Sequence, residues 1–260
     1  MSTSDTGNRS AGNIPVAVMT PPPAQAADAS QPERRLRILG ALAGIIGPVL
    51  LVAYFSAGIP ALTGWPSATE SPAKLTAYAN AHKLLFYAGG WLQATGALLS
   101  VVFLLVLLHR SGTRGTLAWS VALTGFAVLL SVVMVEAALL EAVPVAAANG
   151  DQGTVATAFM LANGVFTRIY PLAPAPLVFA GIGFALSGTT ILPRVFARSA
   201  VVISGLFLLS GLAAVFGTPG LIFAIVMSVV EAIWIPAAAI AFARGQTRMR
   251  TRPAVLEVSR

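Results

Sequence analysis

Long apolar segments alternate with short polar ones along this chain, and six apolar segments are long enough to cross a membrane. They run over residues 38–58, 84–108, 116–143, 169–188, 199–217 and 220–243. A helix needs about 20 predominantly apolar residues to span the hydrocarbon core of a bilayer. Backbone polar groups in hydrocarbon must be satisfied within the segment itself, so such segments predict helices. The pattern therefore predicts an all-α fold, a polytopic transmembrane helical bundle of six spans.

Positive charge is distributed unevenly between the connecting segments, and this distribution predicts an orientation. Thirteen of the 16 Lys and Arg residues fall in the two tails or within two residues of them, or in the turns 109–115 and 189–198. The other three are Lys74, Lys83 and Arg168. An excess of Lys and Arg marks the cytoplasmic side of membrane proteins. Both termini are therefore predicted to be cytoplasmic.

The segments outside the spans form two predicted tails and two longer predicted loops. Residues 1–35 contain few large apolar residues, which predicts a disordered cytoplasmic tail, and residues 245–260 form a second, basic tail. The transmembrane domain between them covers residues 36–244. Its outer loops, residues 59–83 and 144–168, are each long enough to hold a short helix.

Local signals place these short helices and mark irregular positions. Ser71 and Pro72 are suited to the cap and the first residue of a helix lying on the membrane surface. Pro144 is predicted to end the third span, and a second short helix is expected from Thr154 to Asn163. Prolines 171, 174 and 176 disfavour a regular helix where the fourth span begins.

The first span contains a GxxxG spacing, formed by Gly40 and Gly44. Small residues four positions apart let another helix approach closely. We interpret this motif as packing within the molecule, with a dimer contact as the alternative.

Composition narrows the possible classes of function. Hydrophobic residues make up 57% of the chain, charged residues 10%, and the mean hydropathy is +0.82. The formal charge of +7 comes from residues that flank apolar spans, so it indicates contact with membrane lipid and not with nucleic acid. The chain has no cysteine, which excludes disulfides and thiolate metal sites. Its preference for Arg, Ala, Gly and Val is typical of a GC-rich bacterial genome.

Glu231 lies near the middle of the sixth apolar segment, where no Lys or Arg shares its depth. A charge at the bilayer centre costs about 2.5–3.5 kcal/mol on insertion scales. We therefore expect Glu231 either to carry a proton or to be hydrogen-bonded to Ser, Thr, Trp or Gln on a neighbouring helix. The functional interpretation is a proton or cation site, and the structural one is a protonated packing residue.

Three further charged residues lie where the third and fourth spans face the outer side. Glu136 and Glu141 belong to the third span, and Arg168 precedes the fourth at similar depth. We expect Arg168 to pair with one of the two glutamates and to fix how these spans pack. The alternative is an outward-facing polar cavity lined by Glu136, Arg168, Tyr170 and Gln93.

Catalytic motifs are missing from the sequence. It contains no HExxH metal-ligand pair, no GxSxG nucleophile elbow and no GxxxxGK[ST] phosphate loop. Its two histidines, His82 and His109, are expected on opposite sides of the membrane. The sequence thus predicts no catalytic residues, no cofactor and no metal site, and it disfavours an enzyme.

Short motifs are spread over residues 36–243. They are Ser71-Pro72-Ala73-Lys74-Leu75, Tyr78, His82, Gly89-Gly90-Trp91-Leu92, Ser187-Gly188, Leu192-Pro193-Arg194, Ser210-Gly211-Leu212 and Trp234. In this combination the chain resembles a group of uncharacterised six-helix bacterial membrane proteins, which are common in actinobacteria and classed as domains of unknown function. The resemblance implies a fold and a membrane location, and it implies no activity or site residues.

Two functions stay open at this stage. The first is a multi-pass protein of the cell membrane that acts as a non-catalytic scaffold or partner subunit, beside another membrane protein or a second copy of itself. The second is a small proton-coupled transporter or permease that uses Glu231.

Overall fold

The computed structural model describes residues 31–58 and 66–245, which are helical with short turns and contain no strand. The chain divides into two compact units, Met1–Arg35 and Leu36–Arg260, and the features discussed below lie in the second. The elements are α2 (Gln31–Gly58), α4 (Pro72–Ala81), α5 (Lys83–Arg110), α6 (Leu117–Ala148), α7 (Gln152–Gly164), the π-helical η1 (Val165–Ile169), α8 (Tyr170–Leu172), α9 (Pro174–Ser187), α10 (Arg194–Ala213), the 3₁₀ turn η2 (Ala214–Phe216) and α11 (Thr218–Gly245).

Six helical segments are long and apolar enough to cross a membrane, which confirms the predicted all-α, six-span fold. They are Glu33–Tyr54, Lys83–Arg110, Leu117–Ala148, Gln152–Ser187, Arg194–Phe216 and Pro219–Gly245. The fourth segment combines α7, η1, α8 and α9. Helix α2 begins at Gln31, so the end of the tail predicted to be disordered is helical. The rest of that tail and the tail after residue 245 lie outside the described residues.

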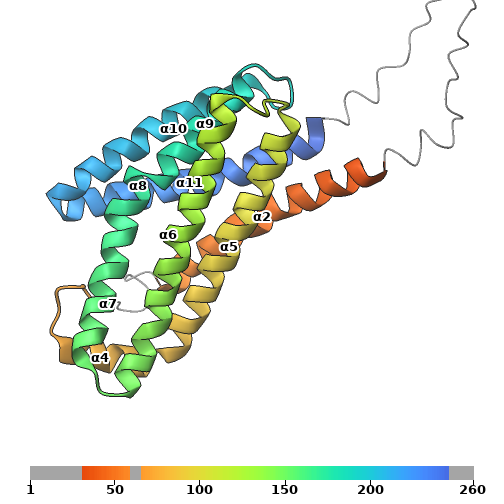
Figure 1. Ribbon diagram of the computed structural model, residues 1–260. Helices are drawn as coiled ribbons and strands as arrows, with labels where there is room; N and C mark the ends of the chain where they lie inside the picture. Colours follow the sequence, from red (N-terminus) through yellow and green to blue (C-terminus); the bar gives the residue numbers. More distant parts are fainter. Residues whose placement is uncertain (1–30, 59–65, 246–260) are drawn as a thin grey trace, which may run out of the picture. The chain divides into compact units, whose positions relative to one another are not determined.

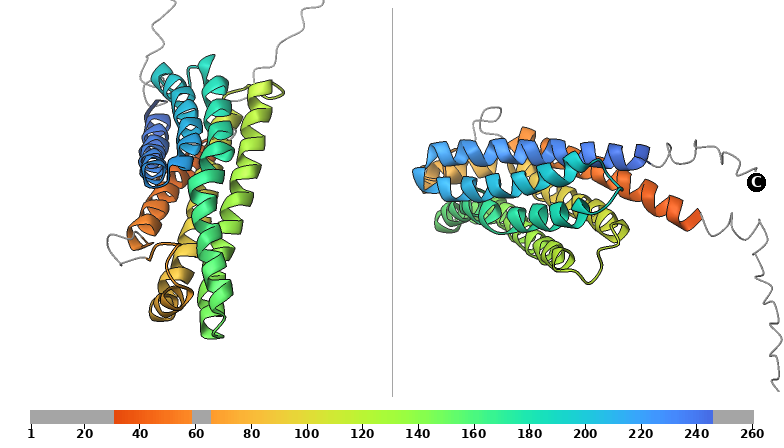
Figure 2. Two further views of the ribbon diagram at one scale, coloured as in Figure 1. Left: turned by 90° about the vertical axis from the view of Figure 1, so that its left-hand side faces the viewer. Right: turned by 90° about the horizontal axis from the view of Figure 1, so that it is seen from above.

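The helices connect alternately at two ends of the bundle. The turns before α6 and before α10 lie near the last residues of α11, whereas α4 and the α6–α7 turn lie at the opposite end, and the α10–α11 turn lies beyond α8, nearer the middle of α6 (Figures 1 and 2). We call the first the basic end, because Arg110, Arg114, Arg194, Arg198 and Arg244 belong to it. We call the second the α4 end.

Aromatic side chains fill the main apolar core, to which α5, α6, α9, α10 and α11 contribute. Phe179 of α9 stacks on Phe207 of α10 at a centroid distance of 5.8 Å and meets Trp234 of α11 edge-on at 5.4 Å. The indole nitrogen of Trp234 donates a hydrogen bond of 2.9 Å to Ser199 Oγ on α10. These contacts hold the last three spans together.

Helices α6 and α9 approach through glycines. A Cβ atom placed on Gly181 would lie 2.4 Å from the backbone nitrogen of Ala122, and one on Gly125 would lie 2.7 Å from the nitrogen of Val178. Only the absence of a side chain allows the two backbones to come so close. The predicted contact between the third and fourth spans is confirmed, although glycines form this part of it.

The GxxxG motif of α2 also packs within the molecule. A Cβ atom on Gly44 would lie 2.5 Å from the ring of Phe103 on α5 and 2.8 Å from Ala239 on α11, and one on Gly40 would lie 2.9 Å from Val106. The motif therefore faces two neighbouring helices, as the sequence predicted.

A second apolar cluster joins α4, α5, α6 and α7 at the α4 end. Leu75 and Phe159 belong to it, together with residues of the last turns of α6. The prediction that Pro144 ends the third span is wrong, because α6 continues to Ala148. A proline removes one helical hydrogen bond, and we attribute the continuation to burial of Val143 and Pro144.

The two short helices predicted at this end are present. Helix α4 starts after Ser71, whose hydroxyl accepts a hydrogen bond of 3.4 Å from the backbone nitrogen of Lys74. Helix α7 includes the predicted stretch from Thr154 to Asn163 and starts after Asp151. Asn80 Nδ2 of α4 donates 3.2 Å to the carbonyl of Ala147, which ties α4 to α6.

Candidate functional site

The fourth span is irregular beside the centre of the bundle. Val165–Ile169 forms a π-helical turn in which the nitrogen of Tyr170 bonds to the carbonyl of Val165. Ala173 then leaves the helical region, with φ −124° and ψ −68°, between two prolines that lack an N–H. The distortion predicted from the prolines is confirmed. Single π turns within helices are frequent at functional sites.

The irregular segment presents Tyr170 to Glu231. The Tyr170 hydroxyl donates a hydrogen bond to Glu231 Oε2. The tyrosine ring is held edge-on against Phe207 at a centroid distance of 5.7 Å. Glu231 lies at the middle of the 28-residue helix α11. A hydrogen bond from a neighbouring element to Glu231 was expected, but the partner is Tyr170 and not Ser, Thr, Trp or Gln.

A second carboxyl group, that of Glu136 on α6, lies beside Gln93 on α5. Each of the two residues is only 5% exposed. The Gln93 side chain lies close enough to the Glu136 carboxyl group to interact with it electrostatically, and both line the same cavity. Among the described residues Gln93 Oε1 has no partner, although it is buried. A buried acceptor without a hydrogen-bond donor costs free energy, unless a molecule bound in the cavity donates a hydrogen bond to it.

Both carboxyl groups line one cavity of about 60 Å³. A water molecule needs about 10–15 Å³ of such space, so the cavity has room for more than one water molecule. No Lys, Arg or His occurs among the described residues that line it. These are Pro48, Leu51, Gln93, Ala97, Ser100, Leu129, Val133, Glu136, Phe166, Tyr170, Ser228, Glu231, Ala232 and Ile235.

The polar groups on the mostly apolar cavity surface are mainly hydrogen-bond acceptors. Ser100 and Ser228 donate their hydroxyl hydrogens within their own helices, at 2.8 Å to Gly96 O and 3.0 Å to Ala224 O. Their oxygens thus remain acceptors, like the carboxyl oxygens and Gln93 Oε1. Two acidic side chains among acceptors suit a proton, a protonated water or another small cation.

Glu141 and Arg168, the other two predicted site residues, are not part of this cavity. Both are exposed, and neither forms an ion pair in the part of the chain that the structure describes. Glu141 lies instead beside Gly90, where an added Cβ would be 3.2 Å from its Oε1. The predicted pairing of Arg168 with a span-three glutamate is therefore wrong.

Helix geometry explains why these two residues point elsewhere. Successive residues of an α-helix are separated by about 100°, so Glu141 is rotated by about 140° from Glu136. Arg168 precedes the inward-facing Tyr170 by two residues in the π turn, which places it on roughly the opposite side of the segment. The structure thus brings together Glu231, Glu136 and Gln93 from the predicted set. It adds Tyr170 as a hydrogen-bond donor, which the sequence analysis considered only as a lining residue.

The arrangement offers acid–base chemistry and no nucleophile. Ser100 and Ser228 have no histidine beside them in the cavity lining. No group of three or more His, Cys, Asp or Glu residues gathers among the described residues to hold a metal ion. Proton binding and release is the chemistry that the side chains of this cavity can perform.

Comparison of the chain with protein-family models, with curated proteins and with solved structures found no match. The resemblance to a bacterial membrane-protein group thus stays a prediction. The fold itself has the architecture of a multi-pass membrane protein with six candidate spans.

Proposed function

We propose that this protein is a small proton-coupled transporter in which Glu231 binds and releases the proton. The observation that supports this proposal best is the contact of Glu231 with Tyr170 at the wall of a cavity that also holds Glu136. Ionisable groups within membrane spans are expensive to maintain and commonly mark ion or proton pathways.

The hydrogen bond from Tyr170 suits a group that changes its protonation state. An ionised carboxylate accepts it directly, and a protonated carboxyl group still has an oxygen that accepts it while donating its own proton elsewhere. Tyr170 can therefore hold Glu231 in place in both states. Glu136 lies close enough to Tyr170 to interact with it electrostatically, so a charge on Glu136 affects the same hydrogen bond.

We further propose the orientation with both termini in the cytoplasm, so that the basic end faces inward. Reporter fusions after Thr69 and Gln152 then report the outer side, and fusions after Gly112 and Gln246 report the inner side. One reversed signal among the four contradicts this topology.

A second candidate function is a non-catalytic scaffold or partner subunit. It is favoured by the exposure of the first and last spans, whose most apolar windows are only 33% and 28% buried inside the bundle. Such faces suit either lipid or another membrane protein.

Proton flux in liposomes separates the two candidates. The full chain is reconstituted with a pH-sensitive dye inside, a pH gradient is imposed, and wild type is compared with Glu231→Gln. Glutamine keeps the hydrogen-bonding shape of a carboxyl group but cannot release a proton at this position. The matched control is Glu141→Gln, which changes an exposed carboxyl group outside the cavity.

We expect flux in wild type and in Glu141→Gln and none in Glu231→Gln, with unchanged melting temperatures in detergent. No flux above that of empty liposomes in wild type, or equal flux in Glu231→Gln, contradicts the transporter and leaves the scaffold.

A further inference from the structure

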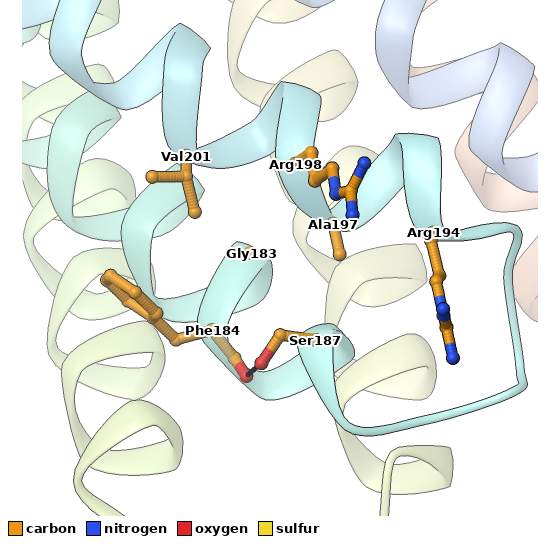
Figure 3. A pocket seen from close by; sticks show the side chains of 7 residues that line it. All are labelled: Gly183, Phe184, Ser187, Arg194, Ala197, Arg198 and Val201. Carbon is orange, nitrogen blue, oxygen red and sulfur yellow. Dashed lines mark hydrogen bonds between the residues drawn. The ribbon is translucent and has the colours of Figure 1, made fainter.

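A groove lies between α9 and α10 at the basic end (Figure 3). Its volume is about 460 Å³, and residues of the last turns of α9 and the first turns of α10 line it. It shares no residue with the cavity around Glu231.

One part of the groove is cationic. Arg194 and Arg198 are one helical turn apart on α10, so both side chains leave the same face of the helix. Both are exposed, and neither has a carboxylate partner in the part of the chain that the structure describes. Arg194 is also the first residue of α10, where the helix dipole adds positive potential.

The other part of the groove is apolar. Phe184 of α9 is 59% exposed and Val201 of α10 is 36% exposed. Figure 3 shows these two side chains on one side of the groove and the two arginines on the other. Val201 follows Arg194 by two helical turns, so the apolar part lies about 10 Å further from the basic end at 1.5 Å per residue.

A glycine lets the two helices come together along the floor of the groove. A Cβ atom on Gly183 would lie 2.7 Å from a methyl group of Val201 and 3.0 Å from the carbonyl of Ala197. Ser187 is not a free donor to a ligand, because its hydroxyl bonds at 2.8 Å to Phe184 O. Recognition of an anion here therefore falls to the two guanidinium groups.

We propose that this groove binds one anionic phospholipid of the adjacent leaflet, with its phosphate on Arg194 and Arg198 and an acyl chain along Phe184 and Val201. Guanidinium groups match the geometry of phosphate oxygens. Basic pockets between membrane helices bind anionic head groups. From the basic end toward the middle of the bundle, the groove is first cationic and then apolar, as the head group and acyl chain of a phospholipid require. Free phosphate would contact only the cationic part.

The test measures lipid retention and not transport, so it does not depend on the proposed function. The full chain in detergent is mixed with phosphatidylglycerol, phosphatidylcholine or inorganic phosphate, and bound lipid is counted by native mass spectrometry. We expect phosphatidylglycerol to be retained over phosphatidylcholine, and inorganic phosphate not to displace it at equal concentration. Equal retention of the two lipids, or displacement by inorganic phosphate, overturns the proposal.

Variants locate the binding. Arg194→Gln with Arg198→Gln is expected to weaken phosphatidylglycerol retention by about tenfold or more, since each basic group near a membrane contributes to binding anionic lipid. The matched control, Arg114→Gln, removes an exposed arginine that belongs to the basic end but not to the groove, and retention is expected to stay as in wild type.

A second variant covers the case in which the double substitution fails to fold. Phe184→Ser keeps both arginines and removes apolar contact, so it is expected to lower retention of phosphatidylglycerol. Unchanged retention in either groove variant, or an equal loss in Arg114→Gln, overturns the site.

Discussion

Helix α6 makes two contacts of opposite kind. Around Gly125 it meets α9 so closely that an added Cβ would touch the partner's backbone. Three helical turns further along, around Glu136, it faces a cavity with carboxyl, amide and hydroxyl groups. Close packing between small residues stabilises membrane helices, whereas buried carboxyl groups cost free energy. The first contact therefore holds the bundle, and the second is the one to which we assign the proposed function.

The largest effect on stability is expected from adding a side chain to the close contact between α6 and α9. Gly181→Ala puts a methyl group 2.4 Å from the nitrogen of Ala122, so the backbones must separate. We expect a loss of about 3 kcal/mol in the free energy of unfolding, the upper part of the usual range for overpacking. The measurement is thermal unfolding in detergent.

The matched control for that variant is Gly205→Ala on α10, where an added Cβ meets no atom within 4 Å. Alanine favours helix over glycine by up to about 1 kcal/mol, so this variant should be neutral or more stable. Equal melting temperatures for the two variants contradict the close contact of α6 with α9.

Removing the hydroxyl group of Tyr170 is expected to have the next largest effect. Tyr170→Phe keeps the ring against Phe207 but leaves Glu231 Oε2 without its donor. An unsatisfied buried acceptor costs about 1–2 kcal/mol. Thermal unfolding should show this loss, and Tyr87→Phe, at a tyrosine 43% exposed on α5, should not. If Tyr170→Phe is as stable as wild type, the hydrogen bond from Tyr170 to Glu231 does not stabilise the fold.

Gln93→Leu sharpens the comparison within the cavity. Leucine removes the amide group that interacts with Glu136 and also the buried Oε1 that has no partner among the described residues. The two changes act in opposite directions, so we expect a loss below about 1 kcal/mol, smaller than that of Tyr170→Phe. A larger loss than in Tyr170→Phe means that Gln93 holds the site together.

The six spans were predictable because length and hydrophobicity decide whether a segment crosses a membrane. The contact of α2 through Gly40 and Gly44 was predictable for a similar reason, since small residues at that spacing favour close packing. The partners of the buried carboxyl groups were not. Glu136 lies beside Gln93 and forms no ion pair with Arg168 among the described residues, and the π turn before Tyr170 sets which side chain faces inward. A shift of one residue in the register of a helix changes which of its side chains face the interior. The amino-acid composition of the helix does not specify this register.

The smallest effect is expected outside both contacts, at Asp151 before α7. Its carboxylate accepts hydrogen bonds of 3.0 Å from Thr154 N and 2.6 Å from Thr154 Oγ1, and these bonds lower the pKa of Asp151 below its ordinary value of 3.8. A lowered folded pKa adds stability that is present above the ordinary value and is lost as pH falls through the folded pKa.

Asp151→Asn tests this sign, because asparagine also caps helices but carries no charge. We expect a slightly lower melting temperature than wild type at pH 7 and no difference in strong acid. A difference that grows as pH falls contradicts the role of the charge.

Infrared difference spectroscopy tests the central claim, that Glu231 binds and releases a proton inside the bundle, most directly. Spectra of the full chain in lipid are recorded before and after a change of pH, and the carbonyl band of protonated carboxyl groups is followed. We expect a band that changes with pH in wild type and in Glu141→Gln and is missing in Glu231→Gln. A spectrum of Glu231→Gln identical to that of wild type would show that Glu231 does not exchange its proton.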